Sequence, residues 1–342
     1  MAVARAKRLP PLHLSSLNVP ARAALPEPAF RPAQNAPQSG STPLARPSHQ
    51  FRLADFEKLA VLGRGNGGTV YKVRHRDTGA LYALKVPHSN QCDAAAATTE
   101  ADVLSRTASP FVIRCHAVLP MATPGDAALL LELADGGSLD ALVGRRAGGP
   151  FPEAALAEVA AQALSGLAHL HARRVAHLDV KPANLLVNDK GEVKLADFGV
   201  ARVLARAGDL CASNAGTAAY MSPERFDPEA RGGGGFFDPC AADVWGLGVT
   251  VLELLVGRYP LLPAGQRPDW AALMCAICFG DAPAVPDGVE ASPEFRSFVA
   301  ACLRKDYRQR ASVAELLAHP FVAGRDVAAS RRALRELLVV VA

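Results

Sequence analysis

The sequence predicts an α+β fold with two lobes, a small β-rich lobe followed by a larger lobe that is mostly helical. Apolar residues alternate with period two through much of residues 51–134, whereas they recur with helical period through residues 135–322. Half of the 342 residues are apolar, which is enough to bury the core of one large or two small domains. A ligand cleft is expected where the lobes join, at residues 132–137.

The small lobe is expected to be one sheet that carries one helix. Alternating apolar and β-branched residues predict strands at residues 56–62, 69–74, 80–86, 112–118 and 128–133. The turn sequence Asp77-Thr78-Gly79 separates the second strand from the third. Residues 94–106 have the composition of a helix.

The large lobe is expected to contain a series of helices and one short hairpin. Helical periodicity appears over residues 152–172, 244–256, 270–278, 295–304 and 313–317. Short strands over residues 185–187 and 193–195 flank the turn Asp189-Lys190-Gly191. The C-terminal extension, residues 323–342, is expected to add an amphipathic helix over residues 328–340.

Composition narrows the functional classes. Residues 1–50 are rich in Pro, Ala and Arg and lack sustained periodicity, which predicts a disordered tail. This tail holds six Lys or Arg and one acid, so the remaining chain is near −1 and a broad basic face for nucleic acid is not expected. The longest apolar run, Val244–Val256, contains Glu253 and is shorter than a bilayer requires, so no membrane span is expected.

The seven cysteines indicate a reducing compartment. Their number is odd and their spacing shows no repeating pattern, unlike a disulfide framework. Cys275-Ala276-Ile277-Cys278 is an isolated pair without the second pair that a structural zinc site needs, so core packing is expected there.

A glycine-rich stretch, Leu62-Gly63-Arg64-Gly65-Asn66-Gly67-Gly68-Thr69-Val70, contains the pattern G-x-G-x-x-G-x-V. The same glycine spacing occurs in dinucleotide-binding folds, but there a helix follows it. Here a predicted strand follows, which favours a hairpin that closes over phosphates because no Cβ blocks its amides. An ordinary Asn-Gly turn is the structural alternative.

Charged residues further along could handle a triphosphate. Lys85 ends the strand Ala83-Leu84-Lys85 and can place an ammonium on the α- and β-phosphates, with Glu100 as its anchor and Asp102 as the second choice. The structural alternative is a solvated strand lysine and an exposed helix acid.

The stretch from Val175 to Arg202 supplies the remaining groups for phosphoryl transfer. Asp179 is expected to orient or deprotonate the substrate hydroxyl, and Lys181 to neutralise the γ-phosphoryl. Asn184 and Asp197 offer the hard oxygen ligands that suit Mg²⁺. His177 is expected to be a structural core residue. These elements, in this order on these predicted strands and turns, indicate phosphoryl transfer.

The sequence resembles the eukaryotic protein kinases over residues 56–321. Ser222-Pro223-Glu224 stands where that family has Ala-Pro-Glu, Asp243-Val244-Trp245-Gly246 resembles the start of its buried helix, and Arg310 lies where an arginine pairs with Glu224. Lys181 and the stretch from Gly216 to Glu224 are similar to the serine/threonine type.

The resemblance implies ATP and Mg²⁺ as cofactors, with Leu131 as the gatekeeper and residues 132–134 as the hinge that binds adenine. The nucleotide-binding residues that it implies are Leu62, Gly63, Gly65, Gly68, Val70, Ala83, Lys85, Leu131, Glu132, Leu133, Ala134, Ser138 and Leu186.

Within that family the sequence looks like a plant mitogen-activated protein (MAP) kinase kinase. The likeness is found in Asp197-Phe-Gly-Val-Ala-Arg202, Cys211-Ala-Ser213, Tyr220-Met-Ser-Pro-Glu-Arg225, Phe279-Gly-Asp281 and Cys302-Leu-Arg-Lys305. It implies phosphorylation of the Thr and Tyr of a Thr-x-Tyr motif in a MAP kinase, and an upstream MAP kinase kinase kinase. A monomer in the cytoplasm, with the nucleus as a second location, is expected.

The resemblance also gives the basic tail a function. Lys7-Arg8 followed by Leu12-His13-Leu14 matches the family's docking pattern for a MAP kinase. The cations would meet an acidic patch and the leucines would fill a groove. An organelle transit peptide is the alternative for this acid-poor segment.

The activation loop departs from the family at two positions. Ser213 and Thr217 are its candidate phosphorylatable residues, but Ala207 stands where the plant pattern has the first acceptor. Leu178 replaces the arginine that, in the family, binds the phosphorylated loop. Phosphorylation is therefore expected to order this loop less strongly, while the groups for phosphoryl transfer are kept. The alternative function is an inactive docking scaffold.

Overall fold

The computed structural model describes residues 51–339, with internal exceptions. The exceptions are Asn66 and residues 89–90, 122–125, 147–148, 213–214, 228–235 and 267. The docking residues Lys7, Arg8, Leu12 and Leu14 and the activation-loop residue Ser213 therefore lie outside the described residues.

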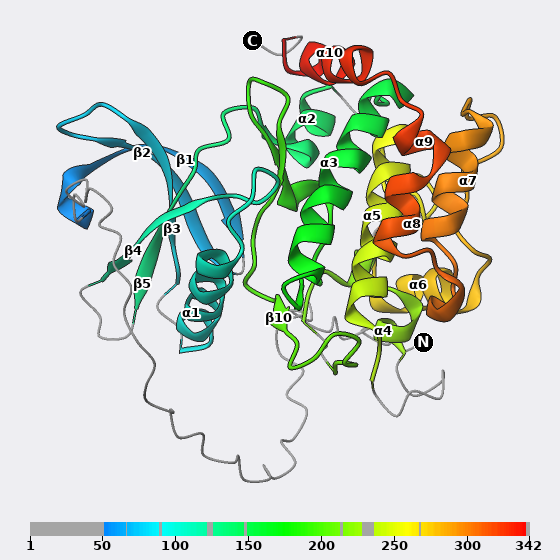
Figure 1. The fold of residues 1–342 in the computed structure, drawn as a ribbon, viewed down its shortest axis with the longest axis horizontal. Helices are drawn as coiled ribbons and strands as arrows, with labels where there is room; N and C mark the ends of the chain where they lie inside the picture. The colour runs from blue at the N-terminus through cyan, green and yellow to red at the C-terminus, as the bar shows by residue number, and fades with distance from the viewer. Residues whose placement is uncertain are drawn as a thin grey trace, which may run out of the picture. The chain divides into compact units, whose positions relative to one another are not determined.

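The first lobe is a five-stranded antiparallel sheet with one helix beside it (Figure 1). Its strands lie in the order β1-β2-β3-β5-β4, and the elements are β1 (Phe56–Gly65), β2 (Gly68–His75), β3 (Leu81–Val86), α1 (Gln91–Arg106), β4 (Cys115–Pro120) and β5 (Ala127–Leu131). A 3₁₀ turn, Leu53–Asp55, precedes β1. The predicted sheet with one helix is confirmed, with strand ends that shift by a few residues.

The fourth strand begins three residues later than predicted. Val112 forms an isolated parallel bridge with Leu195, and the Ile113 N–H donates to the Leu195 carbonyl at 2.9 Å. The segment before β4 therefore binds the second lobe instead of extending the sheet, which alternation in the sequence alone cannot reveal.

The second lobe contains α2–α10 and two small sheets (Figure 1). Its helices are α2 (Leu139–Arg145), α3 (Glu153–His171), α4 (Pro223–Phe226), α5 (Pro239–Val256), α6 (Trp270–Met274), α7 (Pro293–Cys302), α8 (Val313–Ala318), α9 (Pro320–Ala323) and α10 (Val327–Val339). Its strands are β6 (Gly137–Ser138), β7 (Val175–Ala176), β8 (Leu185–Val187), β9 (Val193–Leu195) and β10 (Arg202–Val203). Short turns of 3₁₀ helix lie at Pro182–Asn184, Ala218–Tyr220 and Tyr307–Gln309, and a π-helical turn at Cys275–Phe279.

The central helix α5 is longer than its apolar run predicts. It begins at Pro239, where Asp238 caps two main-chain N–H groups, and ends at Gly257 in the left-handed conformation, φ 74°. Among the described helices it is the one long and apolar enough to cross a membrane, but 78% of these 18 residues are buried inside the fold. Trp245 is completely buried within it, so α5 serves as the core of this lobe.

The isolated cysteine pair packs only in part. Cys278 is half-buried and contacts the main apolar core, whereas Cys275 is exposed. Core packing is therefore wrong for Cys275, which lies exposed at the start of the π-helical turn.

Candidate active site

The glycine-rich stretch forms the hairpin between β1 and β2. Gly65 pairs with Gly68, and Gly63 pairs with Val70. A Cβ at Gly68, whose φ is 132°, would lie 2.3 Å from the Val86 carbonyl oxygen, so the fold itself requires glycine there. A Cβ at Gly63 or Gly65 would meet no protein atom, which leaves their main chain open to a ligand. Leu62, half exposed, precedes them.

Lys85 of β3 connects both lobes through two carboxylates. Its Nζ lies 2.6 Å from Glu100 Oε2 in α1 and 2.7 Å from Asp197 Oδ1. Burial alone would lower the pKa of Lys85, but the two carboxylates raise it above its usual value, so the ammonium stays charged. The expected anchor Glu100 is thus in contact, whereas Asp102 instead pairs with Arg106.

The apolar residues that the resemblance implies for nucleotide binding come from both lobes. Ala83 and Leu131 are paired neighbours in β3 and β5 and are both buried. Val70, Leu133 and Leu186 are partly buried and pack against the same main core. Apolar side chains of this kind would suit an aromatic base.

Polar groups of the connecting segment are arranged around residues 132–134. The Glu132 carboxylate pairs with Lys194 at 3.0 Å and accepts from the Arg114 N–H, so it supports the segment and leaves the ligand contact to the main chain. Within the described part of the chain the Ala134 N–H makes no hydrogen bond, so it can donate to a base. The Ser138 hydroxyl caps α2 at 3.1 Å. This cap is a structural role that the sequence did not reveal.

Asp179, Lys181 and Asn184 converge in one partly buried network with Thr217. Asp179 Oδ2 accepts hydrogen bonds from Lys181 Nζ at 2.6 Å and Asn184 Nδ2 at 2.9 Å, and its Oδ1 accepts from the Thr217 N–H at 2.8 Å. Lys181 Nζ also donates to the Thr217 hydroxyl. Burial would raise the pKa of Asp179, but Lys181 and these hydrogen bonds hold it below its usual value. Asp179 is therefore a carboxylate at neutral pH.

Asp243 of α5 fixes the main chain just before Asp179. Its two oxygens accept from the N–H groups of His177 at 2.9 Å and Leu178 at 2.6 Å, and from His171 Nε2 at 2.8 Å. The Asp243–His171 contact raises the pKa of His171 to about 10 even though burial alone would lower it. Sequence reasoning did not give Asp243 this role, although an acid at the head of an apolar helix is a signal of it.

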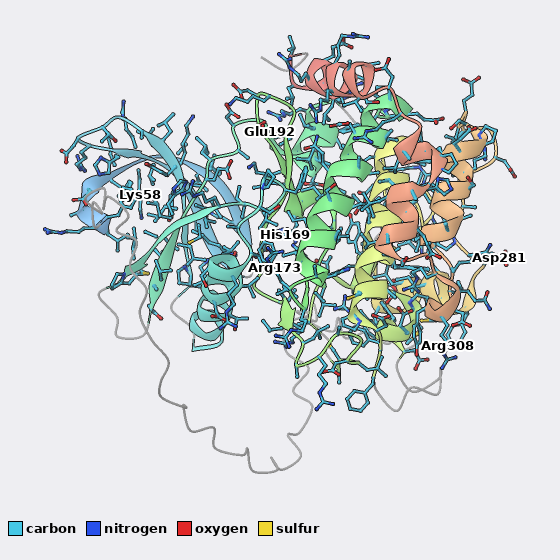
Figure 2. The ribbon with its side chains drawn as sticks, in the orientation of Figure 1. Lys58, His169, Arg173, Glu192, Asp281 and Arg308 are labelled. Atoms are coloured by element: carbon cyan, nitrogen blue, oxygen red, sulfur yellow. The ribbon has the colours of Figure 1, made fainter. Side chains whose placement is uncertain are left out.

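The β8–β9 hairpin carries Asn184 at one end and Asp197 at the other; Glu192 marks its turn in Figure 2. Asp197 has φ 64°, a strained left-handed conformation that turns its side chain toward Lys85. Burial would raise the pKa of Asp197, but Lys85 holds it below its usual value. Within the described residues Asn184 Oδ1 and Asp197 Oδ2 accept no hydrogen bond. One carboxylate and one amide oxygen are hard donors that would suit Mg²⁺.

Leu178 lies in an apolar cluster against which Cys211 of the activation loop also packs. Only 2% of Leu178 is exposed, and it packs with Ala176, Phe237 and Ala242 in this small cluster. Its φ of 64° is left-handed. Arg225 of α4 reaches the adjacent main chain instead, donating to the Leu178 carbonyl at 2.8 Å and to that of Ala215. Sequence reasoning missed this guanidinium.

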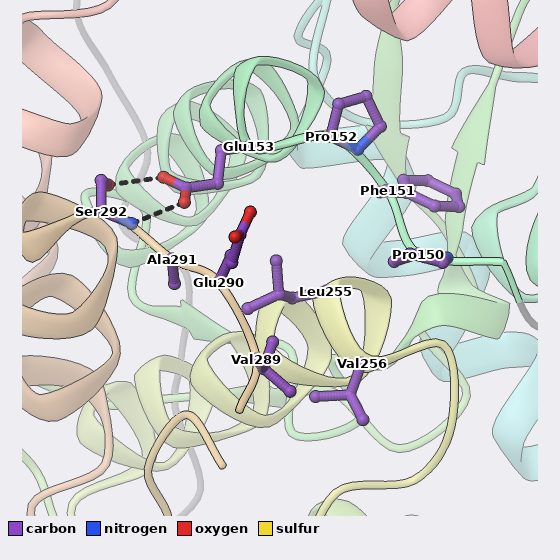
Figure 3. Close-up of a pocket in the computed structure, with 10 residues that line it drawn as sticks. All are labelled: Pro150, Phe151, Pro152, Glu153, Leu255, Val256, Val289, Glu290, Ala291 and Ser292. Carbon is purple, nitrogen blue, oxygen red and sulfur yellow. Dashed lines mark hydrogen bonds between the residues drawn. The ribbon is translucent and has the colours of Figure 1, made fainter. Parts of the chain in front are cut away.

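A separate pocket lies in the second lobe and holds none of the candidate residues (Figure 3). Its lining residues are Pro150, Phe151, Pro152, Glu153, Leu255, Val256, Val289, Glu290, Ala291 and Ser292. Glu153 accepts hydrogen bonds there from the Ser292 N–H and hydroxyl, which join α3 to the segment before α7.

The comparisons with known proteins agree with this geometry. The protein kinase domain model matches residues 56–322. Mitogen-activated protein kinase kinase 9 of Arabidopsis thaliana is 48% identical over 303 residues, which cover 88% of this chain and 95% of that protein. Mitogen-activated protein kinase kinase 10 of the same plant is 49% identical over 291 residues, which cover 85% of this chain and 90% of that protein. The chain therefore belongs to the protein kinases, and within them to the plant mitogen-activated protein kinase kinase type.

Proposed function

We propose that this protein kinase transfers the γ-phosphoryl group of Mg²⁺-bound ATP to the Thr and the Tyr of a Thr-x-Tyr motif in a MAP kinase. The observation that carries the proposal is the Lys85 ammonium held at 2.6 and 2.7 Å between Glu100 and Asp197. Positioning and charge stabilisation are what phosphoryl transfer requires of a protein. A scaffold would not need this complete set of charges, which argues against the non-catalytic alternative.

Each residue of the site has a distinct task in this proposal. Mg²⁺ would offset the negative charge of the phosphates when held by Asp197 and Asn184. Lys85 binds the non-transferred phosphates. Asp179, ionised and fixed by its neighbours, orients the substrate hydroxyl and accepts its proton, and Lys181 stabilises charge on the transferred group.

The partners follow from the relatives. Because the relatives are named MAP kinase kinases, we propose a MAP kinase as substrate and a MAP kinase kinase kinase as activator. Lys7, Arg8, Leu12 and Leu14 would dock the substrate. We also propose a monomer in the cytoplasm or nucleus.

Substrate specificity is testable with a kinase-dead MAP kinase. Intact substrate should receive two phosphates, and variants that lack the Thr or the Tyr of its motif should each receive one, as counted by mass spectrometry. Phosphate on only one of these residues would refute dual specificity.

Deleting residues 1–20 should raise the KM for the MAP kinase but leave ATP binding unchanged, and an unchanged KM would refute docking by this segment.

The activation switch is expected to depend weakly on phosphate. Leu178 offers no cation, and Arg225 already holds the Leu178 and Ala215 carbonyls. Ser213→Ala should therefore lower the initial transfer rate by less than about tenfold. This limit corresponds to roughly 1.4 kcal/mol in the activation free energy. Lys85→Met is the reference for a complete loss. Equal loss in both variants would show that the switch is intact.

A further inference from the structure

The C-terminal helix α10 lies beyond the part of the chain that matches the kinase domain model, which ends at residue 322. It packs across α3 (Figure 1). Leu334 and Leu337 are buried against the main core, at 0% and 4% exposure. The helix is therefore an integral part of this lobe.

The same helix contacts two segments that frame the active site. A Cβ at Gly136, just past the hinge, would lie 3.1 Å from Leu338 Cδ2. A Cβ at Gly191, in the turn of the β8–β9 hairpin, would lie 3.0 Å from Arg335 Cγ. Glycine at both positions gives room for this approach, although at Gly136 the Val187 carbonyl oxygen of β8, at 2.7 Å, would be closer still.

A buried carboxylate on α3 pairs with two arginines, Arg325 just before α10 and Arg331 within it. Glu158 is 0% exposed, and its oxygens accept from Arg325 Nε at 2.9 Å, Arg331 Nε at 3.0 Å and Gln162 Nε2 at 2.9 Å. A carboxylate removed from water is stable only while such partners remain, because its desolvation costs several kcal/mol.

Gln162 connects Glu158 to the β8–β9 hairpin through hydrogen bonds. Its Nε2 also donates to the Gly191 carbonyl at 3.0 Å, and its Oε1 accepts from the Val193 N–H at 2.7 Å. Both main-chain groups flank Glu192, at the point where β9 begins. The side-chain amide is thus oriented by Glu158 at one end and fixes the hairpin at the other.

We infer that Arg325, Arg331, Glu158 and Gln162 form a positioning relay through which α10 sets the β8–β9 hairpin and so the spacing of Asn184 and Asp197. The hairpin is short: Asn184 directly precedes β8, and Asp197 follows β9 after one residue. A shift of its turn is therefore transmitted to both proposed metal ligands. None of the relay residues is among the proposed nucleotide-binding residues, so we expect them to act only through the hairpin. The inference rests on the proposed Mg²⁺ site.

Calorimetric titration with ADP, with and without Mg²⁺, tests the relay in the full chain. In the double variant Arg325→Ala, Arg331→Ala, the Kd for ADP in Mg²⁺ should rise about tenfold, the usual effect of losing a group that supports a metal ligand. The Kd for ADP in EDTA should be unchanged, because the hinge and Lys85 are untouched. Gln162→Leu, which keeps both guanidinium contacts with Glu158, should reproduce this selective loss.

Matched variants separate positioning from stability. Arg332 is exposed on the same helix without a hydrogen-bond or ion-pair partner among the described residues, so Arg332→Ala should behave as wild type. Arg331→Lys should behave close to wild type, since an ammonium can still pair with Glu158. Two results would overturn the relay. One is an equal rise of the Kd for ADP with Mg²⁺ and with EDTA, and the other is that Mg²⁺ tightens ADP binding by the double variant as much as by wild type. If Mg²⁺ fails to tighten ADP binding by wild type, the proposed metal site is wrong and the inference fails with it.

Discussion

Asp197→Asn is expected to lower the rate of phosphoryl transfer on the order of a thousandfold. Asp197 supplies the one carboxylate of the proposed metal site and also holds Lys85 at 2.7 Å. The amide has the same shape but no charge, so the metal ligand and the ion pair weaken together. Initial rates with Mg²⁺, ATP and a kinase-dead MAP kinase measure the effect.

The control for this prediction is an acid in the turn of the same hairpin. The Asp189 side chain makes no hydrogen bond or ion pair within the described residues, so Asp189→Asn should keep the wild-type rate. Asp197→Asn should also keep the wild-type unfolding temperature within a few degrees, because 48% of the Asp197 side chain is exposed. A transfer rate of Asp197→Asn within tenfold of the wild-type rate would show that this carboxylate has no catalytic role.

The parts of the site that the sequence predicts are those encoded by local spacing. The glycine hairpin and the hairpin between Asn184 and Asp197 each lie within about ten to twenty residues, and strand periodicity places their ends. The Lys85–Glu100 contact spans fifteen residues and was predictable because a buried ammonium needs an acid on the next helix.

The parts that the sequence did not predict depend on contacts between distant segments. Asp243 supports a main chain that lies 65 and 66 residues earlier, at Leu178 and His177. Glu158 is paired with Arg325 and Arg331, 167 and 173 residues later. A polar residue inside an apolar helix indicates that a partner exists, but periodicity does not identify which one.

The same limit applies to Leu178. Its substitution for arginine is evident from the sequence, but its burial against Phe237 depends on the tertiary fold. The sequence predicts the loss of a cation, whereas the structure adds that Arg225 donates to the main-chain carbonyl of Leu178 itself. The departure at this position is therefore also a change in packing.

Removing the buried cation Arg310 should destabilise the second lobe by about 3–5 kcal/mol. The fully buried guanidinium donates to both oxygens of Glu224 in α4, at 2.7 and 3.0 Å, and to the Ala241 carbonyl at 2.8 Å. It also lies 5.2 Å from the Trp245 ring centre. Arg310→Ala would leave the Glu224 carboxylate buried without its cation. Urea unfolding followed by tryptophan fluorescence measures the loss.

Comparison with a double variant shows whether the unpaired charge causes that loss. Arg310→Met combined with Glu224→Leu removes both charges and fills much of their volume, so it should destabilise the fold less than Arg310→Ala does. Arg308, exposed near the same segment (Figure 2), provides the matched control, and Arg308→Ala should change stability by less than about 0.5 kcal/mol. If the double variant is the less stable one, the ion pair itself stabilises α4 against α5. If Arg310→Ala is the less stable one, the main role of Arg310 is to neutralise the buried Glu224 carboxylate. The pair then fixes how α4, which follows the activation loop, packs on the core.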